Sequence, residues 1–282
     1  MHGSGCLKTF SANWRKLIMT KVKDIFEYLN KLAPVSLKED FDNVGLLVGD
    51  GEAPVSKIMV ALDITDEVID EAVSFGAELI VSHHPIIFDP MKTVLCSDLS
   101  GKKIYKLIKN DISAICMHTN LDIAAGGVND ELISVLGASS DGFLDYTATD
   151  ADGNMHGCGR VGELENEMCL NDFLLVCKQK LNSNGLRYHD AGLKVKKLAV
   201  MGGSGGGCVE TAKQMGCDTY VTADIKYNQF LDAKELGINL IDADHFCTEN
   251  VIIPVLKDKI CNEFPDCEIA ISAKHAQTAQ FF

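Results

Sequence analysis

Two adjacent histidines, His83 and His84, are the first residues of this 282-residue chain whose types and spacing suit metal chemistry. They end an apolar run at 78–84 and precede Pro85, which keeps the residue before it extended. Successive strand residues point to opposite faces, so two neighbouring imidazoles can each reach a different metal ion only where the chain leaves the sheet. The turn expected at Pro85 provides that place.

Two further segments carry side chains of the same kind. Asp122 closes the polar run 118–122, which ends an expected strand. His245 and Glu249 stand four residues apart at the start of an expected helix, and this spacing places them on one side of it. The candidate metal ligands are therefore three histidines and two carboxylates: His83, His84, Asp122, His245 and Glu249.

This donor set suits two divalent ions per chain, and the same ligands accept Zn, Fe, Mn, Co or Ni. Two ions roughly 3.5–4 Å apart can share a hydroxide nucleophile and stabilise both the attacking and the leaving oxygen of a reaction. His118 also lies at the carboxyl end of an expected strand, where open α/β sheets place ligand sites.

The elements that must position these residues alternate between strands and helices. Apolar runs at 57–63, 78–84 and 112–118 predict buried strands, and residues 23–32 and 101–109 predict helices. Between the first two strands, Thr65 can cap a helix that Gly76 ends. This order predicts a parallel sheet with right-handed crossovers.

A second block of sequence repeats the first at one constant offset without a gap. Gly76 then aligns with Gly216, and Ser82 aligns with Thr222. The repeat predicts an α/β fold with two related α/β domains, mostly parallel sheets, and a dinuclear metal site in the cleft between the domains. Residues 140–155 are polar and rich in turn formers, and they predict a loop or a domain-edge segment in which residues 150–153 are a solvated acidic loop.

The expected division of the chain has four parts. Residues 1–18 are a leader or an added extension, 19–125 the first domain, and 126–244 the second domain with the duplicated strand–helix–strand unit. Residues 245–282 supply a C-terminal helix and strand that close back towards the first domain.

Three motifs together carry a family resemblance. His83-His84-Pro85, residues 118–122 and residues 242–249 resemble the metal motifs of the Nif-three-like dinuclear metal-centre family, also called GTP cyclohydrolase I type 2-like. Residues 41–47, 61–65 and 159–162 resemble the family too, so the likeness covers 19–282. It implies a dinuclear centre and a ring-shaped homo-hexamer whose metal sites face its cavity. It also implies the same five ligands, and it places His118 beside them as a residue that orients a ligand or the substrate.

Two positions depart from the family pattern. Asn228 stands where the family often has His, and Asn cannot shuttle a proton near neutral pH. Asp244 stands where the family usually has Gly, so it either adds a carboxylate beside the metals or caps the next helix, the reading that we favour. Lys226 and Tyr227 join His118 as candidate catalytic residues, because they could neutralise or position a substrate.

The glycine-rich run 202–207 follows an expected strand and opens a helix. Its backbone amides could cradle an anion, or the run could serve only as a tight strand-to-helix turn, which we favour. The run is no P-loop, because Cys208 stands where that motif needs Lys.

Composition excludes several classes of protein. A net charge of −14 argues against binding to duplex nucleic acid, which needs a basic surface. The 11 cysteines are scattered without a C-x-x-C pair, which predicts a reducing cytoplasm and no disulfide framework. No apolar run approaches the roughly 18 residues of a membrane span.

Two classes of function fit these observations. The favoured one is a metal-dependent hydrolase acting on a nucleotide or another small phosphorylated anion, and the family resemblance implies GTP. The alternative is a non-enzymatic metal-binding protein with a regulatory or interaction role, or one that stores or delivers metal.

Overall fold

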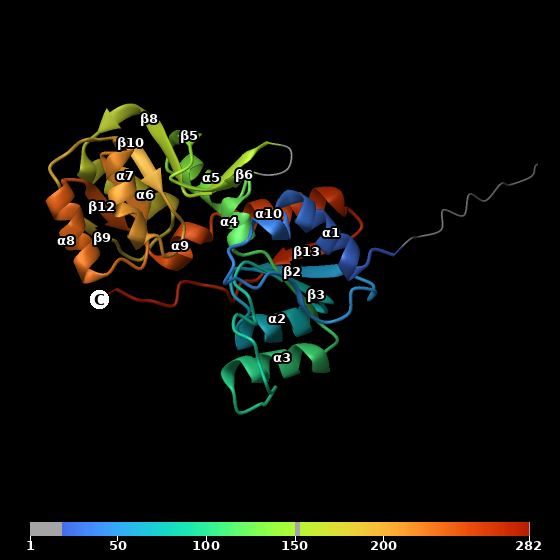
Figure 1. Cartoon of the computed structure of the whole chain (residues 1–282). Coiled ribbons are helices and arrows are strands. Elements are labelled where there is room, and N and C mark those ends of the chain that lie inside the picture. Colours follow the sequence, from blue (N-terminus) through green and yellow to red (C-terminus); the bar gives the residue numbers. More distant parts are fainter. Residues whose placement is uncertain (1–18, 150–152, 282) are drawn as a thin grey trace, which may run out of the picture.

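The structure is a computed structural model that describes residues 19–149 and 153–281. It confirms the predicted α/β class, with two sheets that are each covered by helices on both faces (Figure 1). The prediction for residues 1–18 lies outside the described residues. No described helix has both the length and the apolar character needed to cross a membrane.

The first unit is built on a five-stranded sheet in the order β1-β4-β3-β2-β13. Neighbouring strands are parallel except at the edge, where β1 pairs with β4 in antiparallel fashion. The strands are β1 (Gly45–Val48), β2 (Lys57–Ala61), β3 (Leu79–Ser82), β4 (Ser113–Cys116) and β13 (Glu268–Ile271). The helices are α1 (Val22–Leu32), α2 (Asp66–Phe75), α3 (Leu99–Lys109) and α10 (Ile252–Glu263).

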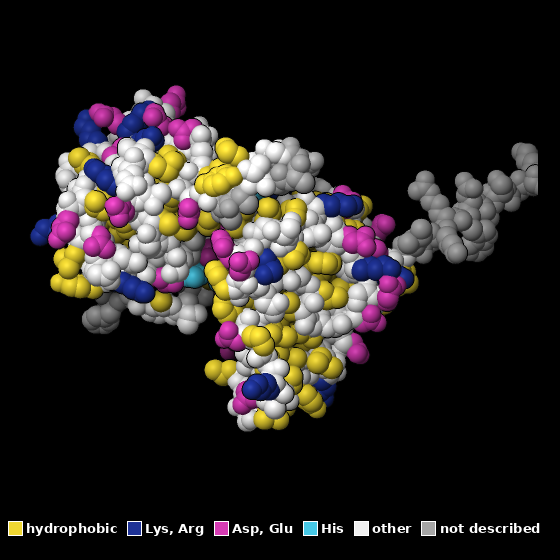
Figure 2. Space-filling model, viewed as in Figure 1, with side chains coloured by type: hydrophobic (Ala, Val, Ile, Leu, Met, Phe, Trp, Pro, Cys, Tyr) yellow, Lys and Arg dark blue, Asp and Glu magenta, His cyan; other side chains and the backbone are white. Residues whose placement is uncertain are grey.

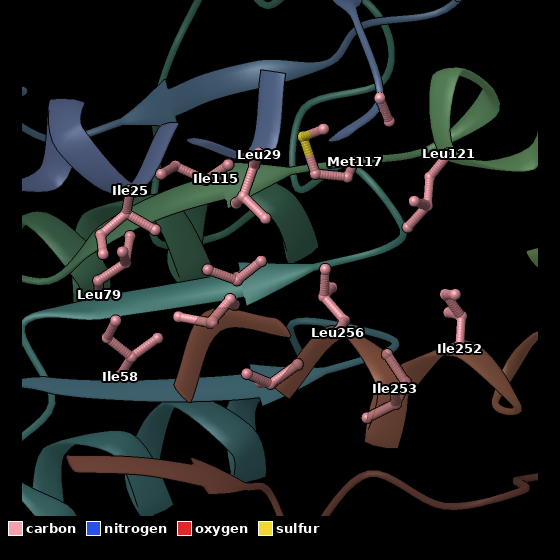
Figure 3. Packing of buried hydrophobic residues seen from close by; sticks show 14 of the residues in the cluster. Ile25, Leu29, Ile58, Leu79, Ile115, Met117, Leu121, Ile252, Ile253 and Leu256 are labelled. Carbon is pink, nitrogen blue, oxygen red and sulfur yellow. The ribbon is translucent and has the colours of Figure 1, made fainter. Parts of the chain in front are cut away.

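Strict alternation along each strand explains how this sheet is covered. Ile58 and Val60 of β2 pack with α1 and α10 on one face, as Figure 3 shows for part of this cluster, while Met59 packs with α2 and α3 on the other. The predicted capping of α2 is confirmed, because the Val68 N–H donates to Thr65 and Gly76 ends the helix with a φ of 77°.

The second unit is built on a six-stranded sheet in the order β5-β8-β10-β11-β12-β9. Its three central strands are parallel and its outer pairs are antiparallel. The strands are β5 (Ala138–Gly142), β8 (Arg160–Met168), β9 (Arg187–His189), β10 (Val195–Val200), β11 (Thr219–Thr222) and β12 (Asn239–Asp242). Helices α5 (Val128–Val135) and α6 (Leu170–Lys180) cover one face, and α7 (Val209–Gln214) and α8 (Tyr227–Leu236) the other.

Short elements complete the chain. They are the 3-10 turns η1 (Val35–Leu37) and η2 (Gly206–Cys208), the helices α4 (Thr119–Ile123) and α9 (His245–Glu249), and the hairpin of β6 (Asp145–Thr149) and β7 (Met155–Cys158).

The loop predicted at 140–155 is wrong for most of its length. Its first residues belong to β5, and its later ones form the β6–β7 hairpin, apart from residues 150–152, which lie outside the described part of the chain. Ser139, Ser140 and Asp141 of β5 are exposed, so this edge strand lacks the apolar alternation by which a strand is recognised. Pairing with β8, rather than an apolar face, makes it a strand.

The C-terminal segment joins the two units. After α10 and β13, residues 272–281 run from the first unit back to the second (Figure 1). There the Asn184 backbone N–H donates to Gln277 Oε1 at 3.1 Å, and the Phe281 ring lies against Gly185. Cys247 of α9 packs in the core of the six-stranded unit. The domain limits at 125/126 and 244/245 stay predictions.

Candidate metal centre

All five candidate ligands lie just beyond the carboxyl ends of central strands. His83 and His84 follow β3, Asp122 lies in α4 after β4, and α9 carries His245 and Glu249 directly after β12. Because the two units face each other at these strand ends, the residues meet at the junction of the units. Figure 2 shows a histidine in the hollow between the units, beside acidic side chains.

The carboxylate of Glu249 lies at the middle of this cluster. Its Oε1 is 3.7 Å from His83 Nε2. Its Oε2 is 2.9 Å from His84 Nε2 and 3.2 Å from His245 Nε2. The two oxygens of one buried carboxylate therefore face imidazoles that come from different directions.

Two groups of donor atoms result, and they share Glu249. His83 and Asp122 form one with it, with His83 Nε2 and Asp122 Oδ1 3.6 Å apart. His84 and His245 form the other, with their Nε2 atoms 3.3 Å apart. Within each group the donor atoms lie within 4.8 Å of one another, close enough to hold a metal ion.

The far nitrogen of each candidate imidazole is anchored. His83 Nδ1 lies 2.8 Å from the Met117 carbonyl oxygen. His84 Nδ1 lies 2.8 Å from Asp63 Oδ1, and His245 Nδ1 lies 2.7 Å from Asp224 Oδ2. A proton on each Nδ1 would satisfy these acceptors and leave the lone pair of Nε2 facing the cluster, which is the arrangement typical of metal-binding histidines.

His118 is the sixth polar residue of the cluster. Its Nδ1 lies 2.8 Å from Asp42 Oδ1, and the second oxygen of this buried carboxylate accepts from the Thr119 N–H and hydroxyl. The His118 ring lies 5.3 Å from the ring of His83 and 5.5 Å from that of His84, and the three residues form a further group able to hold a metal ion. The geometry thus suits either a residue that orients a substrate or an added ligand.

The carboxylates around His84 and His245 favour protonated imidazoles. Burial lowers the pKa of His84, but hydrogen bonds to Asp63 and Glu249 outweigh it and raise this pKa to about 10. Burial also lowers the pKa of His245, yet Glu249 and Asp224 raise it to about 9. Protons on these rings thus compensate the buried negative charge, a task that a metal cation can take over.

The two candidate ligand carboxylates differ in their pKa. Burial raises the pKa of Asp122 to about 6, although the charge of His83 opposes this. Burial also acts to raise the pKa of Glu249, but three histidines hold it well below the usual range of a carboxyl group. Glu249 is therefore the permanent negative charge at the middle of the cluster.

The residues fit a metal ion by a second criterion. His83 Nε2 and Asp122 Oδ1 are buried and have no hydrogen-bond partner among the described residues. Buried polar atoms are normally paired, and a cation bound by both would satisfy them. The donor set of imidazole nitrogens and carboxylate oxygens suits first-row divalent metals.

Sequence reasoning missed the residues that support this cluster. Gly203 has a φ of 64°, and a Cβ there would overlap Glu249 Oε1 and approach His245 Nε2. Buried Asn129 donates to the Asp122 carbonyl and accepts from the Gly202 N–H, both at 2.9 Å. The signal for Gly203 was the run 202–207 itself, whereas that for Asp42 and Asp63 was their place in motifs 41–47 and 61–65.

Of the two readings of the glycine run, the structure favours the tight turn. Gly203 gives room to Glu249, and a Cβ at Gly206 would overlap Gln229. The hollow beside this run, of about 600 Å³, is lined by Glu210, Asp232 and Glu235. Three carboxylates disfavour an anion there.

The remaining sequence candidates lie elsewhere. Tyr227 is 79% exposed and lines a different hollow, with Arg187 and Tyr188, and Asn228 lines the acidic hollow beside the glycine run. Within residues 19–149 and 153–281, neither Lys226 nor Tyr227 has a hydrogen bond or ion pair with the five candidate ligands. Their expected roles in neutralising or positioning a substrate stay predictions.

Asp244 confirms its predicted role as a helix cap. Its carboxylate accepts from the Cys247 N–H at 3.2 Å. Its φ of 73° lies in the left-handed region, which Gly adopts more readily than Asp. The residue also lines a hollow of about 280 Å³ at the mouth of the cluster, together with Asp63, His84, Asp224, His245 and residues 276–279 of the C-terminal segment.

Comparisons with known proteins cover nearly the whole chain. Residues 20–278 match the family model described as Duf34/NIF3 (NGG1p interacting factor 3). A Clostridium perfringens protein named GTP cyclohydrolase 1 type 2 homolog is 40% identical over 263 residues, which cover 93% of this chain and 99% of that protein.

Solved structures share the whole fold. A Bacillus cereus protein related to NIF3 superimposes with a TM-score of 0.88 at 27% identity, covering 94% of this chain and 99% of the other. A Staphylococcus aureus hypothetical protein superimposes with a TM-score of 0.86 at 34% identity, covering 93% and 99%.

Proposed function

Because this chain belongs to the Duf34/NIF3 family, we propose that it is a dinuclear metal-dependent hydrolase acting on a nucleotide or another phosphorylated substrate. The observation that carries the proposal is the shared carboxylate of Glu249, whose two oxygens face two different histidine groups. One ion would be held by His83, Asp122 and Glu249, and the other by His84, His245 and Glu249.

Bound ions would lower the pKa of a water molecule and neutralise charge on the reacting oxygens. The protein supplies the remaining functions. The anchored Nδ1 atoms of His83, His84 and His245 hold these rings in one orientation, which avoids reorganisation during the reaction. His118, with Nδ1 held by Asp42, presents Nε2 as a group that can bind a substrate oxygen or move a proton.

GTP is the first substrate to test. The curated relative named above is called a GTP cyclohydrolase 1 type 2 homolog, which supports a nucleotide substrate for this chain as well. A ring-shaped hexamer in the cytoplasm, as the family resemblance implies, belongs to the same proposal.

The experiment is an assay of the purified full chain after metal removal and reconstitution. Zn, Mn, Fe(II), Co and Ni are restored separately, and each form is assayed against GTP, other nucleotides and simple phosphoesters. We expect turnover with at least one metal, and we expect Glu249→Gln and His83→Ala to abolish it. Glu263→Gln makes the same change at an exposed position and should retain full activity.

One outcome would contradict the hydrolase. Full metal binding with no turnover across the panel would favour the metal-binding regulatory protein instead.

A further inference from the structure

A cavity of about 400 Å³ lies between the C-terminal segment and the second unit, close to the candidate metal centre. Its polar wall consists mainly of side-chain amides, from Asn182, Asn184, Asn250, Gln277 and Gln280. None of its lining residues is Asp, Glu, Lys or Arg. In a chain with a net charge of −14, this cavity is thus polar and uncharged.

Two of the residues that line this cavity each carry a buried side-chain atom without a partner. Asn250 Oδ1 and Gln277 Nε2 are buried, and neither has a hydrogen-bond partner in the described part of the chain. One is an acceptor and the other is a donor. Buried polar groups without partners are rare, so the pair indicates a ligand that carries a complementary donor and acceptor.

Two residues of the C-terminal segment, His275 and Gln277, hold this wall in place. The Leu62 N–H donates to His275 Nδ1 at 3.1 Å, which ties the segment to the first unit. Gln277 Oε1 accepts from the Asn184 N–H, which ties it to the second unit and leaves Nε2 as the unpaired end of the amide. The rings of His275 and Phe246 lie 5.5 Å apart and give the cavity aromatic surface.

The cavity adjoins the candidate metal centre. It shares Phe246, Ala276 and Gln277 with the hollow of about 280 Å³ that contains His84 and His245. Phe246 is also the neighbour of His245 in α9. A molecule bound in the cavity can therefore extend its other end towards the candidate ligands.

We infer that this amide-lined cavity binds an uncharged, hydrogen-bonding heterocycle, the base of a nucleoside, while the reacting end of the same molecule lies at the metal centre. The inference rests on the proposed function for the reacting end only. Nucleobases carry neighbouring donors and acceptors on their edges and a flat face that packs on aromatic rings. A bare phosphate finds no cationic side chain among the lining residues.

The test is equilibrium binding to the full chain, measured by calorimetry without added metal and without turnover. The probes are guanosine, adenosine, cytidine and uridine, with ribose 5-phosphate as the probe that lacks a base. We expect at least one nucleoside to bind, and ribose 5-phosphate to bind at least about tenfold more weakly.

Two variants locate the binding. Gln277→Glu keeps the acceptor for Asn184 and replaces the unpaired donor by an oxygen, so the preferred nucleoside should bind at least about tenfold more weakly. Asn250→Leu removes the unpaired acceptor without touching the anchors of the segment, and it should have a similar effect. Gln179→Glu makes the same change as the first variant on an exposed face of α6 and should bind like the natural chain.

The outcomes separate this inference from the proposed function. Absence of nucleoside binding, equal binding of ribose 5-phosphate, or unchanged affinity in both cavity variants would overturn it. Nucleoside binding, combined with no turnover in the assay of the metal-reconstituted chain, would leave this inference standing and contradict the hydrolase instead.

Discussion

Glu78 in the first unit and Asp218 in the second occupy matching places. Each carboxylate accepts hydrogen bonds from two successive backbone N–H groups at the start of a neighbouring strand, those of residues 56 and 57 and of residues 196 and 197. The glycines two residues before them, Gly76 and Gly216, share a φ of 77°. The two units therefore match not only in their order of strands and helices but also in individual hydrogen bonds.

The strand ends of the two units differ. The alignment that pairs Gly76 with Gly216 also pairs His84 with Asp224, and Asp63 with Gly203. In the first unit Asp63 anchors His84, whereas in the second Gly203 makes room for Glu249. The shared backbone arrangement thus sets the positions of the side chains at the strand ends. Each unit then contributes different residues to one cluster.

The largest effect on metal affinity is expected when the second unit gains a side chain at Gly203, where it has none. In Gly203→Ala the new Cβ overlaps Glu249 Oε1. The backbone at this position also has a conformation that L residues rarely adopt. Metal affinity should fall by more than about 100-fold, beyond the range typical of residues that only support a ligand. Gly207→Ala places its Cβ in open space and serves as the control. Calorimetry and metal analysis measure both, and full metal content in Gly203→Ala would refute the role of this glycine.

The pH dependence of metal binding tests whether both units contribute a ligand. His84 and His245 have pKa values of about 10 and about 9, so both are protonated at neutral pH, and a metal must displace these protons. Affinity should therefore rise with pH, by up to about 100-fold per pH unit between pH 6 and 8, and the rise should lessen above pH 9. Calorimetry in buffers of different ionisation enthalpy counts the protons released. An affinity that does not change with pH would exclude these imidazoles as ligands.

The anchoring carboxylates allow a matched test of the two units. Asp63→Asn and Asp224→Asn each keep an oxygen beside the histidine and remove the charge that supports it. Each should lower metal affinity by about tenfold. Asp258→Asn, at an exposed position of α10, should not change it. An effect from only one of the two would show that a single unit dominates the site.

The smallest effect is expected from changing the matching carboxylates Glu78 and Asp218, and it is an effect on stability. Glu78→Gln and Asp218→Asn weaken equivalent charge-assisted hydrogen bonds, and each should reduce the free energy of unfolding by about 1 kcal/mol. Denaturant unfolding measures this, and metal affinity should stay unchanged in both. If the two variants lose very different amounts of unfolding free energy, these matching hydrogen bonds do not contribute equally to the stability of the two units.

Sequence periodicity and capping were sufficient for much of the fold. Continuous apolar runs predict the central strands because buried parallel strands are apolar on both faces, and Thr65 and Gly76 delimit a helix through local hydrogen bonds. The β6–β7 hairpin escaped prediction because neither strand is a continuous apolar run, and only their pairing with each other makes them strands.

The amino-acid sequence by itself determined that His83, His84, Asp122, His245 and Glu249 stand at strand ends, since strand direction and a following turn are local properties. Only the tertiary structure decided that Glu249 faces both histidine groups and that Asp42 holds His118. These contacts join segments far apart in the chain, and their geometry depends on how the two units pack, which no local pattern encodes.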